Sequence, residues 1–114
     1  MGEPDMIAAI APIVGGRLYP DIGPDDAVMP FATFQQVGGE AVNFLAGASD
    51  KVGVRMQINV WSRSRAEAMT LIRQIEVVMA AQLHARIEGG AIARYDDTTR
   101  ARGAMQDFSL WFDA

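Results

Sequence analysis

Apolar and polar residues alternate in two segments of the chain, and both segments close on a tryptophan. The segments are "QINVW" at residues 57–61 and "DFSLW" at residues 107–111, and they hold the only two tryptophans. Such alternation predicts β-strands, because successive side chains of a strand point to opposite faces of a sheet. Trp61 and Trp111 therefore fall on the polar side of their strands, where Arg55, Gln57 and Asn59 also lie.

Apolar runs bounded by glycine and proline predict strands at residues 31–39, 52–62, 91–97 and 104–112, and a very short strand at 17–19. The strands at 52–62 and 104–112 contain the two alternating segments. Residues 20–30 are expected to form a surface loop. Residues 39–51 join two neighbouring strands and include Phe44 and Leu45. Most hairpin loops are shorter than this, and long ones are usually functional or mobile, so the segment is expected to be a contact arm.

A helical pattern follows the second long strand. Apolar residues recur at three- and four-residue steps from Ser64 until the pair Gly89–Gly90, which is expected to end the helix. Ser64 and Glu67 have the spacing of a capping box. A shorter helix is predicted at residues 5–11, with Asp5 as its N-cap and Pro12 ending it or opening a new turn.

The predicted order is helix, strand, strand, long helix, strand, strand. This order favours an α+β fold, with an antiparallel sheet of about four strands and one long and one short helix packed on one face. The length of 114 residues fits a single domain spanning residues 1–114.

The two tryptophans have two interpretations. Each can lie near a strand end, where a loop or the termini of the same chain cover it. Alternatively, the polar face can be a subunit interface, because tryptophan and arginine are enriched among the residues that dominate binding energy. The candidate interface residues are Trp61, Trp111, Gln57, Asn59, Arg55, Phe44 and Leu45.

Charge and composition exclude several classes of protein. The formal net charge of −4 argues against a protein that grips nucleic acid through a basic face. Arg94, Arg100 and Arg102 lie near Asp96 and Asp97, which suggests charge pairing around a hairpin. The chain has no cysteine, and the longest apolar run, residues 6–14, is too short to span a membrane.

No pattern indicates catalysis, a metal site or a cofactor. The only histidine, His84, lacks partners at metal-ligand spacing. The acid pairs Asp25–Asp26 and Asp96–Asp97 lack the spacing of a calcium loop and are expected to be solvated turn residues. The glycine pairs match neither a P-loop nor a dinucleotide fingerprint. We therefore predict that the chain is not an enzyme and binds no cofactor.

Four segments in order resemble one family. The segments "VGGRLYP", "MPFATFQQVGGE", "RMQINVWSRSRAEAMTLIRQIEVVM" and "ARYDDTTRARGAMQDFSLWF" span almost the whole chain. Together they resemble the small tail-completion, or tail-terminator, proteins of long-tailed bacteriophages, prophages and gene-transfer particles.

The resemblance implies a structural protein of the virion, located at the head-proximal end of the tail after assembly in the bacterial cytoplasm. Its subunits would form a ring, with six expected, that terminates the tail tube and joins it to the head connector. DNA would only pass through the lumen. The implied partners are other copies of the chain, the tail tube protein and the connector or stopper protein.

Two other functions stay open at this point. A head-side connector or stopper subunit would share the size, the acidity and the lack of catalytic residues. A small-molecule-binding regulatory α+β domain could use the same layout, because one fold supports many functions.

Overall fold

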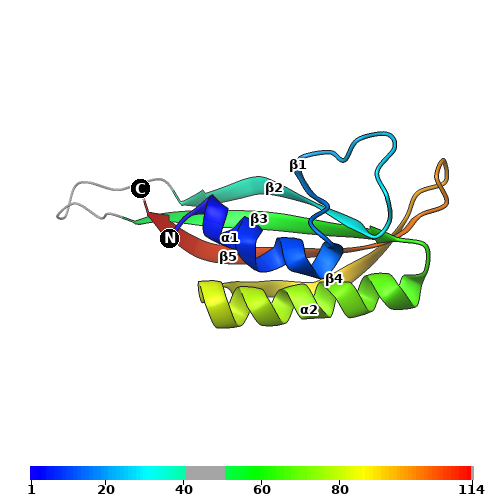
Figure 1. Cartoon of the computed structure of the whole chain (residues 1–114). Coiled ribbons are helices and arrows are strands. Elements are labelled where there is room, and N and C mark those ends of the chain that lie inside the picture. Colours follow the sequence, from blue (N-terminus) through cyan, green and yellow to red (C-terminus); the bar gives the residue numbers. More distant parts are fainter. Residues whose placement is uncertain (41–50, 114) are drawn as a thin grey trace.

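The computed structural model describes residues 1–40 and 51–113 (Figure 1). Its helical elements are α1 (Glu3–Ile10), the 3₁₀ helix η1 (Ala11–Val14) and α2 (Arg65–Leu83). Its strands are β1 (Leu18–Pro20), β2 (Phe31–Glu40), β3 (Lys51–Ser62), β4 (Arg86–Tyr95) and β5 (Arg102–Asp113). None of the helices among these residues is long and apolar enough to cross a membrane.

The strands form one five-stranded sheet in the order β1-β2-β3-β5-β4. Strands β2 to β5 pair antiparallel, as the order of the predicted elements indicates. The additional strand β1 pairs parallel with β2 over three residues, so the sheet is mixed at this edge. The parallel pairing arises because residues 21–30 carry the chain back to the end of the sheet where β1 began (Figure 1).

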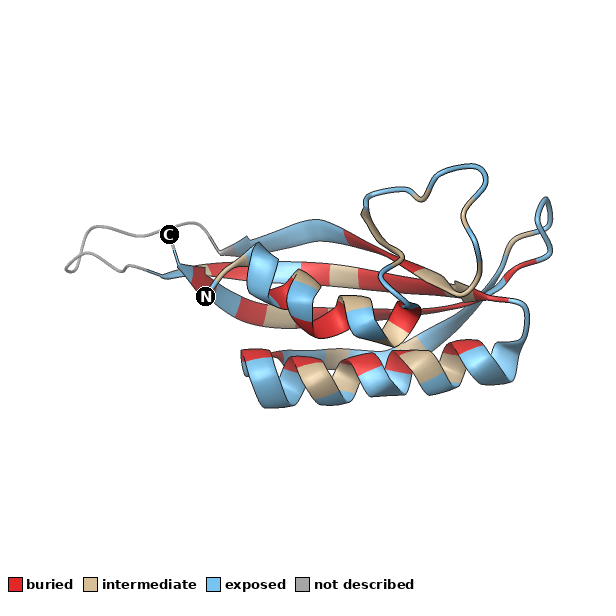
Figure 2. Ribbon diagram, viewed as in Figure 1, coloured by how far each residue is buried: buried red, intermediate tan, exposed pale blue. Residues whose placement is uncertain are grey.

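Both helices lie on one face of the sheet (Figure 1). Figure 2 shows the buried residues of α2 along the side that faces the strands. The register of β3 and β5 turns one alternate set of their side chains toward this helix, including Met56, Ile58 and Phe108, which are fully buried. Met6 and Ile10 of α1 complete the same core. The predicted α+β layout, with helices on one face, is therefore confirmed.

The helix α2 ends earlier than the sequence pattern predicts. His84 adopts a left-handed conformation with φ of 53°, and the Ala85 N–H donates to the carbonyl of Met79 at 3.1 Å. This reversal ends the helix, and residues 86–90 open β4 instead. The expected stop at Gly89–Gly90 is wrong, because these glycines lie at an irregularity of β4, where Gly89 has φ of 72°.

The predicted helix N-termini also need correction. Helix α1 begins at Glu3, and Asp5 lies inside the first turn, where its carboxylate accepts the Gly2 N–H at 2.7 Å. Only half of the predicted capping box at α2 forms. Ser64 Oγ accepts the Glu67 N–H at 3.1 Å, but the Glu67 carboxylate accepts the hydroxyl of Ser62.

Candidate functional site

The face of the sheet that no helix covers, here called the open face, carries the candidate residues described by the structure. Arg55, Gln57, Asn59 and Trp61 alternate with the core residues of β3 and so belong to this face. Trp61 pairs with Gly103 of β5, and Trp111 pairs with Gly53 of β3. The tryptophans therefore share one face, as predicted, but lie about 27 Å apart along β5 at 3.4 Å per residue.

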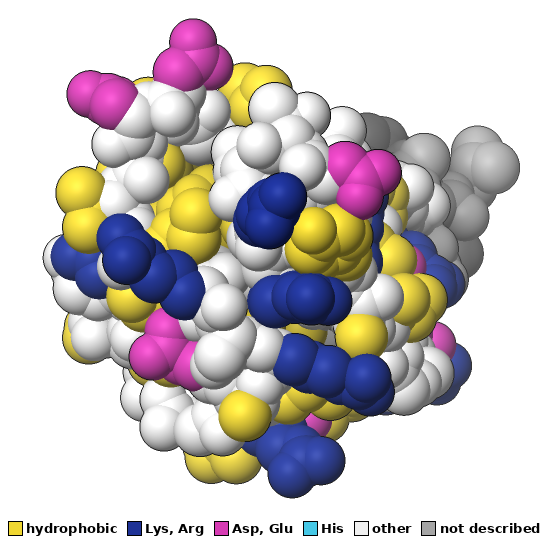
Figure 3. All heavy atoms as spheres, turned by 90° about the vertical axis from the view of Figure 1, so that its right-hand side faces the viewer, with side chains coloured by type: hydrophobic (Ala, Val, Ile, Leu, Met, Phe, Trp, Pro, Cys, Tyr) yellow, Lys and Arg dark blue, Asp and Glu magenta, His cyan; other side chains and the backbone are white. Residues whose placement is uncertain are grey.

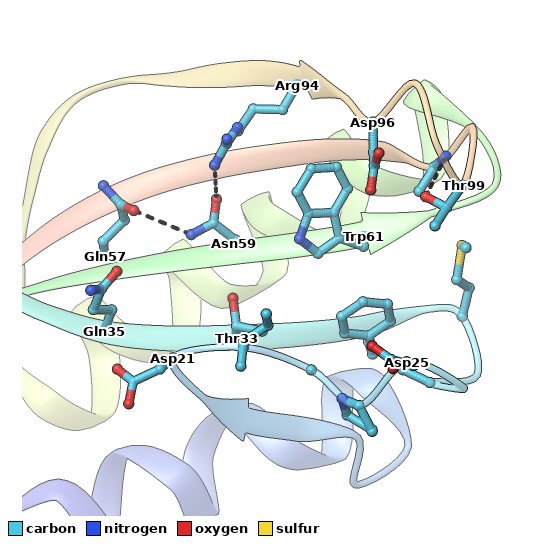
Figure 4. Close-up of a pocket in the computed structure, with 17 residues that line it drawn as sticks. Asp21, Asp25, Thr33, Gln35, Gln57, Asn59, Trp61, Arg94, Asp96 and Thr99 are labelled. Atoms are coloured by element: carbon cyan, nitrogen blue, oxygen red, sulfur yellow. Dashed lines mark hydrogen bonds between the residues drawn. The ribbon is translucent and has the colours of Figure 1, made fainter.

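A row of hydrogen bonds crosses the middle of the open face. Its contacts are Arg55 Nε to Asp107 Oδ2 at 3.1 Å, Gln57 Nε2 to Asp107 Oδ1 at 3.3 Å, Asn59 Nδ2 to Gln57 Oε1 at 3.3 Å, and Arg94 Nη1 to Asn59 Oδ1 at 3.0 Å. Figure 4 shows the two bonds that meet at Asn59. The polar side chains of β3 thus hold one another in fixed positions.

Trp61 is partly covered by its own chain. Its indole lies over Gly103, where an added Cβ would be 2.8 Å from the ring atom Cε3. The guanidinium carbon of Arg94 lies 5.5 Å from the ring centroid, within the range of a cation–π contact. For Trp61, these contacts support the interpretation in which the same chain covers the side chain.

A cavity of about 420 Å³ lies beside Trp61. Phe31 and Trp61 contribute aromatic surface to it, and Asp21, Asp25 and Asp96 contribute carboxylates (Figure 4). The loop 21–30 folds close to this aromatic surface, since an added Cβ at Gly23 would lie 2.8 Å from the Phe31 ring. Sequence reasoning missed the cavity, because one of its walls is the loop 21–30, whose path no local pattern specifies.

Trp111 has a different environment. Its side chain is 53% exposed, and it borders a hollow of about 470 Å³ together with Gly39, Arg55 and Arg86. Strand β4 begins at Arg86, which pairs with Ser109, so β4 pairs with no residue of β5 beyond Ser109. Two other candidates, Phe44 and Leu45, lie outside the described residues.

The ion pairs of the described residues gather in the half of the sheet that contains Trp111. Asp113 accepts from Lys51 and from the terminal amine of Met1, and Arg86 Nε lies 2.9 Å from Glu88 Oε1. The Lys51 hydrogen bond, with a smaller contribution from the terminal amine, lowers the pKa of Asp113 to about 2. Hydrogen bonds from Arg86 and then Ser109 lower the pKa of Glu88.

The opposite end of the sheet is rich in arginine, and the ion pairs predicted there do not form. Arg94, Arg100 and Arg102 make no ion pair with Asp96 or Asp97. Asp96 instead accepts the N–H of Thr98 at 2.9 Å, which closes the turn locally. The guanidinium of Arg102 stacks over Tyr95 at 4.2 Å from the ring centroid.

The open face carries aromatic, amide and charged side chains but no metal-binding cluster among the described residues. Within residues 1–40 and 51–113, no group of three histidine, aspartate or glutamate side chains is placed to hold a metal ion. His84 lies exposed at the end of α2, close to the hollow beside Trp111. The face therefore offers aromatic surface, amides and charged groups in fixed positions.

Sequence reasoning also missed one buried polar residue. Gln106 is 2% exposed, and its amide nitrogen donates to the carbonyls of Glu88 and Gly89 at 3.0 and 3.1 Å. These carbonyls lie at the irregularity of β4, so Gln106 supports that edge strand. The available signal was a polar residue between Ala104 and Phe108 in the series of β5 that faces the helices.

Comparison with known proteins places these observations in a family. Residues 6–114 match the family model described as "Tail completion protein gp17". Among solved structures, a chain of the "Virion of native gene transfer agent (GTA) particle" has a similar fold, with a TM-score of 0.61 and 18% sequence identity. The alignment covers 94% of this chain and 86% of that one. A comparison with curated protein sequences returns no match.

Proposed function

The chain belongs to the gp17 family of tail completion proteins, and we propose that it forms the ring that terminates the tail tube of a phage-like particle. The family makes it a structural component of a virion tail. The observation that carries the proposal is the family match itself, which extends over residues 6–114 and so includes the whole open face. The shared fold with a chain of a gene transfer agent particle supports the same assignment.

In this proposal the ring has six subunits, joins the tube to the head connector and lets DNA pass through its lumen. A closed ring requires two different contact surfaces on each subunit. The two ends of the open face differ in charge pairing and in aromatic exposure, so the subunit has distinct surfaces to offer. The net charge of −4 favours free passage of DNA over its retention.

The proposed subunit contact is centred on Trp111 and Arg55. Trp111 is 53% exposed and Arg55 lies beside the same hollow. An exposed tryptophan next to an arginine is the composition typical of residues that dominate binding energy. Gln57, Asn59 and Trp61 support this contact by holding the open face in shape. The candidates Phe44 and Leu45 lie outside the described residues. The proposal assigns no catalytic role to any residue.

Removing the chain from a producing particle tests the proposed function. We expect tails of uncontrolled length that do not join filled heads, because the tube lacks its terminating ring. Purified protein added to such tails should appear in electron micrographs as a ring with a central hole at one end of the tube.

The alternative of a head-side connector subunit predicts a different outcome. The added protein would then bind isolated heads and leave tail ends bare. Tails of normal length joined to heads in the absence of the chain would contradict both versions of the function.

A further inference from the structure

Exposed arginines gather at the end of the sheet that contains Trp61, here called the arginine end. They come from the β3–α2 junction and from the hairpin of β4 and β5, and they are Arg63, Arg65, Arg94, Arg100 and Arg102. Figure 3 shows dark-blue side chains gathered on this end of the molecule. None of the five forms an ion pair with a described residue.

Two of these guanidinium groups are held in place by aromatic rings. Arg102 lies over Tyr95 at 4.2 Å from the ring centroid, and Arg94 lies over Trp61 at 5.5 Å. Stacking uses the flat face of a guanidinium and leaves N–H donors in its plane for a partner. Arg94 uses one such donor on Asn59. The arginine end is therefore partly ordered before any partner binds, which reduces the entropic cost of binding.

The stability of α2 does not account for the two arginines at its start. Arg65 is the first residue of the helix, and Arg63 precedes its N-cap, Ser64. The N-terminus of a helix carries partial positive charge, so cations there oppose the helix dipole. Neither side chain has an ion pair among the described residues that would offset this effect.

We propose that the arginine end docks against a carboxylate-rich surface of a different protein at the tail-to-head joint. The proposal rests on the proposed function, which supplies that joint. Charge complementarity is its basis, because unpaired and exposed guanidinium groups recognise carboxylates through paired hydrogen bonds.

A second copy of the chain is a poorer partner for this end. Away from the arginine end, the carboxylates of Asp107, Asp113 and Glu88 already form ion pairs within the chain. A neighbouring copy that used them would compete with those pairs. DNA is also a poorer partner, because its continuous row of phosphates would also meet Asp25 and Asp96 beside the cavity at Trp61. A protein surface can instead place its carboxylates opposite the arginines alone.

The test measures binding of purified protein to the tail tube protein and to the connector protein of the same particle. The variants are Arg63→Glu and Arg65→Glu, singly and together. Arg73→Glu is the matched control, because Arg73 lies exposed on the same helix without an ion pair among the described residues. We expect the double variant to weaken binding to one of the two proteins by about tenfold or more. The control should change it by less than about twofold.

Three other results would each overturn the proposal, and they can be distinguished from one another. Equal binding by wild type and double variant would leave the proposed function standing and remove this inference alone. A variant that loses binding to a short DNA duplex, or loses self-association, while binding both proteins normally would assign the arginine end to DNA or to a second copy. A wild-type protein that binds neither partner would refute the proposed function and this inference together.

Discussion

The two ends of the open face start from similar sequence and finish in different environments. Each tryptophan closes an alternating strand, and each pairs across the sheet with a glycine. Trp61 nevertheless lies under Arg94 and beside a loop that forms a cavity, whereas Trp111 is 53% exposed. The charges differ as well, because the ion pairs of the described residues all lie away from the arginine end.

The difference shows that the neighbouring strands decide how far a side chain in such a pattern is covered. At Trp61 the sheet is complete on both sides, with Phe31 of β2 and the end of β4 close by. At Trp111 the strand β4 has not yet begun, since its first residue pairs with Ser109. One tryptophan therefore contributes to the stability of the subunit, and the other is available for contact.

Replacing each tryptophan by alanine should separate these roles most clearly. Trp61→Ala should lower the free energy of unfolding by about 2–3 kcal/mol, because the indole packs on Gly103 and Arg94. Trp111→Ala should change it by less than about 0.5 kcal/mol and still reduce ring assembly. Urea denaturation and electron micrographs of assembled tails measure the two effects. Equal destabilisation by both variants would remove the distinction between the ends.

Gly103 offers a second way to test the Trp61 end. An added Cβ would lie 2.8 and 2.9 Å from two atoms of the indole, so Gly103→Ala should cost about 1–2 kcal/mol of stability. The reason is steric, and the cost should shrink when Trp61 is also replaced by alanine. A double-mutant cycle on chemical denaturation measures this coupling. Additive effects of the two changes would show that the indole does not depend on the glycine.

Charge changes should act with opposite sign at the two ends. Arg65→Glu at the start of α2 should raise the free energy of unfolding by about 0.3–1 kcal/mol, because a carboxylate suits a helix N-terminus. Arg86→Glu should lower stability, because it removes the ion pair with Glu88. Thermal melts of both variants at low ionic strength provide the comparison. Destabilisation by Arg65→Glu would indicate that Arg65 supports the fold, contrary to the interpretation given for the arginine end.

The smallest effect is expected at Asp113 and depends on pH. The pKa of this carboxyl is lowered from its ordinary value of 3.8 to about 2 in the folded chain. Its contribution to stability is therefore present above pH 3.8 and is lost as the pH falls toward 2. The difference in melting temperature between wild type and Asp113→Asn should shrink over that range. A difference that stays constant down to pH 2 would contradict the ion pairs of Asp113 as its cause.

Local patterns were sufficient to predict the core of the fold. Alternation in β3 and β5 identified the residues that face the helices, and the spacing of apolar residues identified α2. These predictions succeeded because a period of two or of 3.6 residues places apolar side chains on one side of an element whatever lies around it. The short helix and the segment of β1 were visible for the same reason, although their limits shifted by a few residues.

Predictions that depended on the boundary of an element or on a partner in space were less successful. The end of α2 was placed too late, because a left-handed histidine ended it before the glycine pair. The arginines of the β4–β5 hairpin were expected to pair with Asp96 and Asp97, but Arg94 and Arg102 stack on aromatic rings instead. Nearness in sequence does not specify which of several possible partners a long side chain selects.

The sequence by itself determined the layers of this protein and the shared face of its two tryptophans, because side-chain periodicity is a property of each element alone. The tertiary structure decided which tryptophan is covered, where the cavity forms and at which end the arginines lack acidic partners. Those outcomes depend on where β4 begins and on how residues 21–30 fold over β2, and both are set by contacts between segments distant in the chain.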